Sequence, residues 1–179
     1  RIEIARRKSL DHQGKLMCHQ CNYEELLSGA DLEATPNRMR VLEVVGNNRF
    51  PLSAGDIYKT LERSSTINRV TVYRILDLLV ARGVVDRIST GGRAFYYGLA
   101  PNEHHPPHPH FYCKNCGQMD CLRPESIVVD AEPFWKTYPG RIDKVEVRID
   151  GICKNCEKRQ SEPSPPIATK RRFPDGELR

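Results

Sequence analysis

The hydrophobic positions in the first half of the chain recur at helical spacing, from about residue 23 to residue 83. A short first helix is predicted around Leu26 and Leu27. The second is predicted to begin at Thr35-Pro36, because Thr is a common N-cap and proline fits the first helical turn. Gly46-Asn47-Asn48 ends it, and its apolar stripe is formed by Val41, Leu42 and Val45.

Two further helices follow. Ser53 and Asp56 have the spacing of a capping box and predict a helix start. Its buried face is predicted to comprise Ile57, Tyr58 and Leu61. A fourth helix is predicted from Asn68 to Arg82, with Gly83 as its C-cap. Its apolar stripe has the spacing i, i+3, i+4 and i+7 and consists of Val72, Ile75, Leu76 and Leu79.

The pattern then changes to that of strands. Residues 84–88 and 93–97 flank a Ser-Thr-Gly-Gly turn, which predicts a β-hairpin. Helices followed by such a hairpin make a winged helix. Further on, Phe111-Tyr112 and Gln118-Met119 predict short strands, and residues 125–138 predict a helix. Residues 144–149 alternate strictly between charged and apolar side chains, which predicts a strand with one apolar face.

These patterns predict an α+β chain with an N-terminal winged helix-turn-helix domain and a second, small α/β domain at the C-terminal end. The linker is rich in proline and histidine, and both ends of the chain are charged and lack apolar periodicity. Met17 is a candidate native start. The predicted segments are a flexible extension (1–21), the winged helix (22–98), a hinge (99–107), the metal-binding domain (108–160) and a disordered tail (161–179).

Composition sets the class of partner. The chain of 179 residues has a formal net charge of +5, which is compatible with an anionic partner and equally with a solvated basic surface. No apolar run approaches the roughly 18 residues of a membrane span, and no signal peptide is recognisable, so we expect a cytoplasmic protein without a membrane partner. In that compartment, cysteines at C-x-x-C spacing bind metal more often than they form disulfides.

The predicted fourth helix leaves polar side chains outside its apolar stripe, near its N-terminus. A solvent-exposed face is the simpler interpretation, but the hairpin that follows favours a recognition helix entering the major groove of double-stranded DNA. The candidate DNA-binding residues are Asn68, Arg69, Thr71, Tyr73 and Arg74. Residues 31–100 contain ten basic and seven acidic side chains, a mild excess that favours a dimer reading a specific operator.

Two C-x-x-C pairs give the strongest chemical signal. Zinc prefers four soft ligands in a tetrahedron, and a structural zinc site of this kind is closed and stabilises a domain with little core. A disulfide or redox pair is the alternative. The predicted structural zinc ligands are Cys113, Cys116, Cys153 and Cys156. A third C-x-x-C, Cys18 and Cys21, has no partner pair nearby and is either a weak metal candidate or two unrelated thiols.

A second ligand set lies directly upstream. His108 and His110 alternate in an extended segment, so both imidazoles face one side, and Cys121 offers a third donor. One residue among Glu103, His104 and His105 is expected to complete a regulatory metal site. The alternatives are a surface histidine cluster in a flexible linker and a metallohydrolase, for which Glu103 is the only nearby carboxylate. We expect no enzyme, because a proline-rich linker is a poor scaffold for an active site.

In combination, these motifs resemble the ferric uptake regulator family of bacterial metal-dependent repressors. The resemblance rests on the Thr-Pro helix start, Ser-Ala-x-Asp-Ile-Tyr at 53–58, Thr-Val-Tyr-Arg at 71–74, His-x-His-x-x-Cys-x-x-Cys at 108–116 and the late C-x-x-C. It implies that the small C-terminal domain is an α/β dimerisation domain with the four-cysteine zinc site. It also implies a homodimer in which a corepressor metal at the hinge sets two winged helices at operator spacing. It further implies that Tyr73 and Arg74 contact DNA.

The sensing residues depart from the iron- and peroxide-sensing pattern. Such relatives have a histidine just before the Ser-Ala-x-Asp-Ile-Tyr stretch, where this chain has Arg49-Phe50-Pro51, and a carboxylate where it has Tyr96. Cys121 also replaces a carboxylate, and sulfur in place of oxygen favours zinc over Fe(II) or Mn(II). The chain thus resembles the zinc uptake regulator branch, repressing metal-uptake genes. The alternatives are an iron-responsive repressor, or a peroxide or thiol-redox sensor using Cys18 and Cys21.

Overall fold

The computed structural model describes residues 21–127, 129–130 and 132–161. The extension up to residue 20, with Met17 and Cys18, and the tail from residue 162 lie outside the described residues. The helices are α1 (Tyr23–Gly29), α2 (Pro36–Gly46), α3 (Ala54–Glu62), α4 (Arg69–Ala81), the 3-10 helix η1 (Pro124–Ser126), α5 (Glu132–Thr137) and α6 (Lys154–Ser161). The strands are β1 (Leu52–Ser53), β2 (Val85–Ser89), β3 (Phe95–Leu99), β4 (His110–Cys113), β5 (Met119–Cys121) and β6 (Arg148–Gly151).

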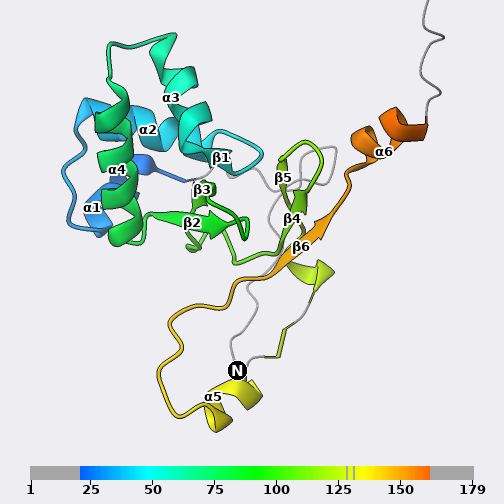
Figure 1. Ribbon diagram of the computed structural model, residues 1–179. Helices are drawn as coiled ribbons and strands as arrows, with labels where there is room; N and C mark the ends of the chain where they lie inside the picture. The colour runs from blue at the N-terminus through cyan, green and yellow to red at the C-terminus, as the bar shows by residue number, and fades with distance from the viewer. Residues whose placement is uncertain (1–20, 128, 131, 162–179) are drawn as a thin grey trace, which may run out of the picture.

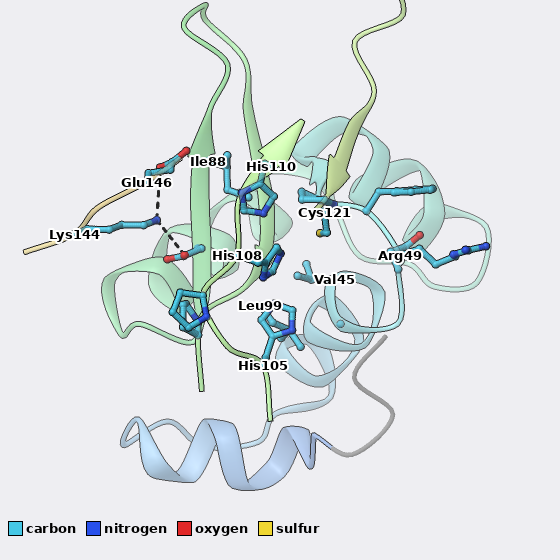
Figure 2. A pocket seen from close by; sticks show the side chains of 18 of the residues that line it. Val45, Arg49, Ile88, Leu99, His105, His108, His110, Cys121, Lys144 and Glu146 are labelled. Atoms are coloured by element: carbon cyan, nitrogen blue, oxygen red, sulfur yellow. Dashed lines mark ion pairs between the residues drawn. The ribbon is translucent and has the colours of Figure 1, made fainter. Parts of the chain in front are cut away.

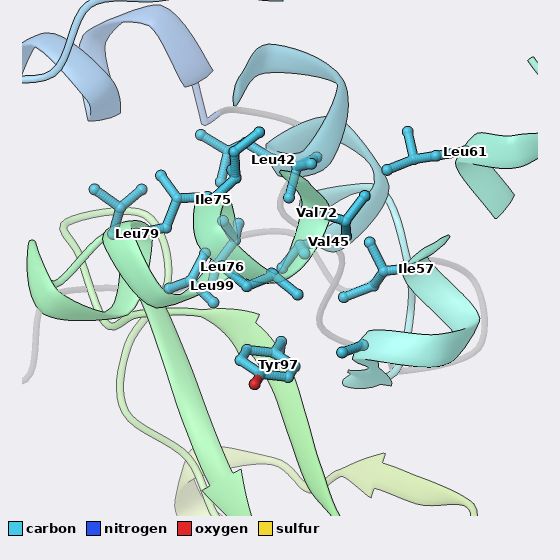
Figure 3. Packing of buried hydrophobic residues seen from close by; sticks show 14 of the residues in the cluster. Leu42, Val45, Ile57, Leu61, Val72, Ile75, Leu76, Leu79, Tyr97 and Leu99 are labelled. Carbon is cyan, nitrogen blue, oxygen red and sulfur yellow. The ribbon is translucent and has the colours of Figure 1, made fainter. Parts of the chain in front are cut away.

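The N-terminal domain packs α1 to α4 against an antiparallel sheet of order β1-β3-β2 (Figure 1). Its core lies between α2, α3, α4 and the hairpin (Figure 3). Leu42, Ile57, Leu76 and Leu79 are almost completely buried, and each such side chain contributes about 1.5–3 kcal/mol through removal from water. The predicted apolar stripes of α2 and α4 are therefore confirmed, whereas Tyr58 is only half-buried.

The ends of the helices follow from specific side chains. Asn68 caps α4, because its Oδ1 accepts hydrogen bonds from the N–H of Thr71 at 2.8 Å and from the Thr71 hydroxyl at 2.9 Å. Gly83 has a φ of 68°, a conformation that favours glycine, and it follows the last turn of α4. Ser53 caps α3 as predicted. In a full capping box the Asp56 carboxylate would accept a hydrogen bond from the Ser53 N–H. Here it accepts one from the Ser53 hydroxyl, at 2.6 Å.

The hairpin is confirmed and is longer than predicted. β3 continues to Leu99, one residue into the predicted hinge, and both Leu99 and Ala100 are buried. Strand β1, which no hydrophobic pattern predicted, pairs with β3. The hinge itself contains a turn in which the backbones of Asn102 and His105 hydrogen-bond each other, at 2.9 and 3.1 Å.

The C-terminal domain is built on a second sheet of order β5-β4-β6, in which β4 pairs antiparallel with β5 and parallel with β6. Among the described residues of this domain, the buried apolar side chains are few: Cys113, Met119 and Cys156. Helix α5 stands apart from both sheets in Figure 1. This domain has too little apolar core to hold itself together by burial alone.

Two predictions in this domain were wrong. The helix predicted over 125–138 is reduced to η1 and α5, with Ile127 in an extended conformation between them. Pro133 explains the break, because it lacks the N–H that a continuous helix would pair with the carbonyl of Val129. The strand predicted over 144–149 runs instead over Arg148–Gly151, because β4 supplies pairing partners only from His110 onward.

Among the described residues, hydrogen bonds and an ion pair connect the two domains. The Tyr96 hydroxyl donates to the Gly117 carbonyl, and Arg148 Nη1 donates to the Ser89 carbonyl at 2.5 Å. Lys144 Nζ lies 3.0 Å from Asp86 Oδ2 on β2. Ser161, the first residue of the predicted tail, is instead the last residue of α6. Within the described part of the chain, no helix has the length and apolarity to cross a membrane.

Candidate metal centres and DNA-binding surface

The four cysteines of the two C-x-x-C pairs converge at one end of the second sheet. Cys113 ends β4, Cys116 lies in the turn that Gly117 allows with a φ of 73°, and Cys153 and Cys156 flank the start of α6. Their sulfur atoms all lie within 4.8 Å of one another, and Cys116 Sγ is 3.8 Å from Cys153 Sγ. Zinc–sulfur bonds of about 2.3 Å in a tetrahedron place sulfur atoms about 3.8 Å apart. The donor set and its spacing therefore fit zinc.

The backbone around this cluster favours a thiolate. The N–H groups of Cys116 and Cys153 point at Cys113 Sγ, the latter at 3.3 Å, and hold the pKa of the Cys113 thiol well below its ordinary value. Arg159 Nη2 lies 3.5 Å from Cys156 Sγ. A metal ligand must be deprotonated, so these donors prepare the cluster for a cation.

The second cluster joins His108, His110 and Cys121, whose ligand atoms also lie within 4.8 Å of one another. Strand pairing brings them together, because His110 and Cys121 are direct cross-strand partners in β4 and β5. Side chains at such opposed positions share a face and lie close together. His108 precedes His110 by two residues, and their ring centres are 4.7 Å apart. The predicted three-ligand set is thus brought together by the fold.

The state of these side chains suits a metal. His108 Nε2 and His110 Nδ1 are buried and, within the described residues, have no hydrogen-bond partner. Burial, together with the neighbouring His108 and Lys144, lowers the pKa of His110 to about 3. Burial also raises the pKa of the Cys121 thiol to about 12. The histidines are therefore neutral ligands at pH 7, whereas Cys121 must lose a proton to bind a metal.

The histidine cluster lines a cavity of about 440 Å³ between the two domains (Figure 2). Of the three residues predicted to complete the site, only His105 lines this cavity, with its ring 4.9 Å from that of His108. Burial lowers its pKa to about 4. Glu103 is exposed, and His104 is placed by its N–H bond to Asn102 Oδ1 at 2.8 Å; neither lines the cavity.

Sequence reasoning missed the charged residues of the cavity wall, which are Arg49, Asp86, Asp143, Lys144 and Glu146. Asp86 comes from β2, and Lys144 and Glu146 come from the segment before β6. Lys144 Nζ lies 3.0 Å from Asp86 and 3.7 Å from Glu146. The only hint in the sequence was the carboxylate of Asp86, which lies between the apolar residues Val84-Val85 and Ile88. The cavity thus carries carboxylates from both domains beside the imidazoles.

The predicted DNA-binding residues lie at the N-terminal end of α4. Arg69, Tyr73 and Arg74 are exposed, whereas Asn68 and Thr71 form the cap described above. Arg69 Nη2 bonds the Tyr73 hydroxyl at 3.1 Å and its guanidinium lies over the Tyr73 ring, 5.4 Å from the centre. The wing adds Arg87, stacked on Phe95 with 4.8 Å between guanidinium and ring centre, which the sequence reasoning did not single out.

Cys21 belongs to neither cluster. Its thiol lies 3.8 Å from Asn102 Oδ1, at the hinge. Its predicted companion Cys18 is outside the described residues, so the third C-x-x-C stays a prediction.

A winged helix with an exposed recognition-type helix, followed by a small domain with two cysteine and histidine clusters, defines a metal-dependent DNA-binding regulator. The model of the ferric uptake regulator family matches residues 29–149. The ferric uptake regulation protein of Bacillus subtilis is 30% identical over 138 residues, which cover 76% of this chain and 93% of that protein. The chain therefore belongs to the ferric uptake regulator family.

Solved structures agree with this assignment. The Vibrio cholerae ferric uptake regulator superposes with a TM-score of 0.60 at 25% identity, covering 74% of this chain and all of that chain. A zinc uptake regulator complexed with zinc and DNA superposes with a TM-score of 0.55 at 23% identity. The superposition covers 77% of this chain and 92% of that chain, and it shows the shared fold. The family consists of metal-responsive transcriptional regulators and not of enzymes, so the metallohydrolase alternative is set aside.

Proposed function

We propose that this protein is a zinc-responsive repressor of metal-uptake genes. The observation that carries the proposal is the meeting of Cys121 Sγ with the imidazoles of His108 and His110 at the hinge. A thiolate and two imidazoles form a soft donor set that suits zinc, whereas Fe(II) and Mn(II) sites favour carboxylate oxygen. When bound, the metal supplies a fixed point of positive charge at which ligands from separate segments are held together.

The hinge residues translate this binding into a domain arrangement. His105 lies in the hinge and is the fourth ligand supported by its position on the cavity wall. His108 directly follows the hinge, and His110 and Cys121 lie in the second sheet. Holding these segments together restricts how the winged helix can move relative to the C-terminal domain. A ligand that binds only the closed arrangement shifts the population toward it. The closed arrangement is the one proposed to match two half-sites of an operator.

Cys113, Cys116, Cys153 and Cys156 are proposed to hold a second, structural zinc. All four tetrahedral positions are then filled by protein sulfur, which leaves no position for exchange with solvent. The sparse apolar core of this domain supports such a role. The two sites therefore differ in exchange: the cysteine site is closed, and the histidine site faces a cavity.

A homodimer is proposed from apolar surface on the C-terminal domain. Phe134, Trp135 and Tyr138, on or next to α5, are each more than half exposed, and Val145 is 49% exposed. An exposed apolar patch of this kind marks an interaction site. A second copy is the occupant that an operator with two half-sites requires, because each recognition helix reads one half-site.

The DNA-contacting residues are proposed to be Arg69, Tyr73 and Arg74, on a helix that Asn68 and Thr71 cap.

Operator binding under buffered free zinc tests this proposal. We expect DNA affinity to rise with free zinc in the wild type and to stay at the zinc-free value in His108→Ala and Cys121→Ser. Metal analysis should give two zinc ions per chain, one of them removable by a mild chelator. Equal DNA affinity with and without zinc contradicts the repressor mechanism. A response to iron or manganese with none to zinc favours the iron-responsive alternative, and loss of binding on peroxide treatment at fixed zinc favours the redox alternative.

A further inference from the structure

The hinge between the two domains contains an ordered turn built around one asparagine. Asn102 Oδ1 accepts hydrogen bonds from the N–H groups of His104 at 2.8 Å and His105 at 3.0 Å. The backbones of Asn102 and His105 also bond each other in both directions, at 2.9 and 3.1 Å. An asparagine that bonds the backbone N–H groups two and three residues further on fixes a turn. The hinge is therefore not a loose linker at this point.

The same side chain attaches this turn to the winged helix. Asn102 Nδ2 donates to the Ala100 carbonyl at 3.2 Å, and the Ala100 N–H donates to the Val84 carbonyl at 3.1 Å. Ala100 is buried and directly follows β3. Asn102 Oδ1 also lies 3.8 Å from the thiol of Cys21, on the segment that leads into α1. These contacts make the turn part of the N-terminal domain.

The turn carries one candidate metal ligand to the cavity. His105 closes the turn, and its ring lies 4.9 Å from that of His108 (Figure 2). Pro106 and Pro107 follow and stiffen the chain, because each fixes its own φ. His108 Nδ1 lies 3.0 Å from the Pro106 carbonyl oxygen, which can only accept, so Nδ1 carries the proton and Nε2 is left as the ligand atom. Nε2 is the buried atom without a hydrogen-bond partner among the described residues.

We propose that Asn102 is a positioning residue of the regulatory site, which fastens His105 to the winged helix so that metal binding at the hinge acts directly on the DNA-binding domain. The inference rests on the zinc-responsive function proposed above. Asn102 itself does not line the cavity, so it acts through His105. His110 and Cys121 belong to the second sheet, and shared ligation by these two residues and His105 joins the two domains.

Two quantities depend on this turn. The first is the zinc affinity, because a ligand that is already held in place does not have to be ordered when the metal binds. The second is the coupling between zinc and DNA, which is the ratio of operator affinities with and without the regulatory zinc. A loose hinge would absorb the displacement of His105, whereas a turn bonded to the end of β3 transmits it to the winged helix.

The test compares wild type with Asn102→Ala, Asn102→Asp, His105→Ala and the double variant Asn102→Ala/His105→Ala, all with the cysteine site loaded. Aspartate keeps the oxygen that accepts from the two N–H groups but loses the Nδ2 donor to the Ala100 carbonyl. Asn37→Ala is the matched control, since this exposed asparagine lies on α2 and does not line the cavity.

Three quantities are measured on each protein. They are the hydrogen exchange of the His104 and His105 amides without regulatory metal, the zinc affinity of the regulatory site by chelator competition, and the coupling ratio at saturating zinc. Unchanged exchange of amides in α4 verifies that each variant is folded.

We expect Asn102→Ala to speed exchange of both hinge amides and to lower zinc affinity about tenfold, the lower end of what loss of an outer partner of a metal ligand costs. The coupling ratio should fall about threefold or more even when zinc is saturating. Asn102→Asp should restore the exchange and the zinc affinity but not the coupling ratio, and Asn37→Ala should change none of the three. In the His105→Ala background, Asn102→Ala should change zinc affinity less than about twofold, because both substitutions remove the same contribution.

Three results overturn the proposal. Equal exchange of the hinge amides in wild type and Asn102→Ala would mean that Asn102 does not hold the turn. Additive losses of zinc affinity in the double variant would mean that Asn102 does not act through His105. A wild-type coupling ratio in Asn102→Ala or Asn102→Asp would mean that the attached turn does not transmit binding to the winged helix.

None of these three results touches the zinc-responsive function, which is read from wild type alone. A wild-type protein that binds no exchangeable zinc, or whose operator affinity does not rise with zinc, contradicts that function and overturns this inference with it.

Discussion

Removal of the metal from the four-cysteine site should unfold the C-terminal domain and leave the winged helix intact. The perturbation is either a strong chelator or the substitution Cys156→Ser, which removes one of the two cysteines that are fully buried in the cluster. The reason lies in the unequal cores of the two domains. The N-terminal core comprises residues from all four helices and the hairpin, whereas Met119 is the one large apolar side chain buried among the described residues of the second domain.

The magnitude follows from the second sheet. Strands β4, β5 and β6 contain four, three and four residues. Ordering a residue costs about 1.5 kcal/mol, so these strands cost on the order of 16 kcal/mol. Burial of Met119 offsets about 3 kcal/mol of this. The remaining deficit, on the order of 13 kcal/mol, falls within the roughly 10–16 kcal/mol of apparent free energy that a structural zinc contributes at neutral pH.

Hydrogen exchange of backbone amides is the appropriate assay, since it reads the two domains separately. In the second sheet, the N–H groups of His110, Cys113 and Lys114 donate to the carbonyls of Val147, Gln118 and Gly151 at 2.9–3.0 Å. Their protection should vanish on metal removal, whereas amides in α4 keep theirs. Trp135 is the single tryptophan and gives a second reporter for the C-terminal domain.

Cys21→Ser is the matched control, because it removes a thiol outside both clusters and should preserve protection in both domains. Persisting protection of the His110, Cys113 and Lys114 amides after complete zinc removal would refute the reasoning. Loss of protection in α4 at the same chelator concentration would refute it as well, since the winged helix has a core of its own.

Three further predictions concern the sensing site and DNA. Zinc affinity of the histidine cluster should rise about tenfold per pH unit between pH 6.5 and 8.5, because zinc binding displaces one proton from Cys121. Burial raises the pKa of this thiol to about 12, so it is protonated over the whole range. In a chelator titration, the zinc affinity of Cys121→Asp should show no such dependence on pH. Urea unfolding of protein that carries zinc in the cysteine site alone should show full stability above pH 6.5 and a loss of stability as the pH falls. The unfolded chain protonates His110 at an ordinary pKa of about 6.5, whereas in the folded chain burial lowers this pKa to about 3. His110→Asn should flatten this loss, which is on the order of 5 kcal/mol. Arg74→Ala should weaken operator binding by about 1–3 kcal/mol in a fluorescence anisotropy titration without changing the melting temperature, and unchanged binding would remove Arg74 from the DNA surface.

The helices of the winged helix could be predicted because their signals are local. Val72, Ile75, Leu76 and Leu79 define one face within a single element, and Asn68 caps the helix that they form. The strand predicted at 144–149 failed for the opposite reason. Alternation shows that a segment can form a strand, but pairing depends on a partner far away in sequence. Here β4 offers that partner only opposite Arg148 and the three residues that follow.

The same distinction explains which site residues could be found. The four cysteines are visible because zinc knuckles have fixed local spacing, and His108 and His110 are visible as an alternating pair. Asp86 and Lys144 are 58 residues apart and meet only because the hinge folds β2 against the segment before β6. No sequence spacing encodes a contact of that kind, so the charged half of the cavity could not be predicted.

Each of the two clusters takes one ligand from the same short strand, β4, and their charges make them interdependent. His110 opens β4 and Cys113 closes it, so the clusters are separated by about 10 Å at about 3.3 Å per residue. Zinc with four thiolates carries a net charge of about −2. Such a charge stabilises a divalent cation about 10 Å away by on the order of 1–2 kcal/mol even at a water-like dielectric constant. We therefore expect a fixed loading order, with the cysteine site filling first and raising the affinity of the histidine site. A titration of metal-free protein with cobalt(II), whose absorption distinguishes sulfur-rich from histidine-rich sites, would contradict this order if the histidine cluster filled first.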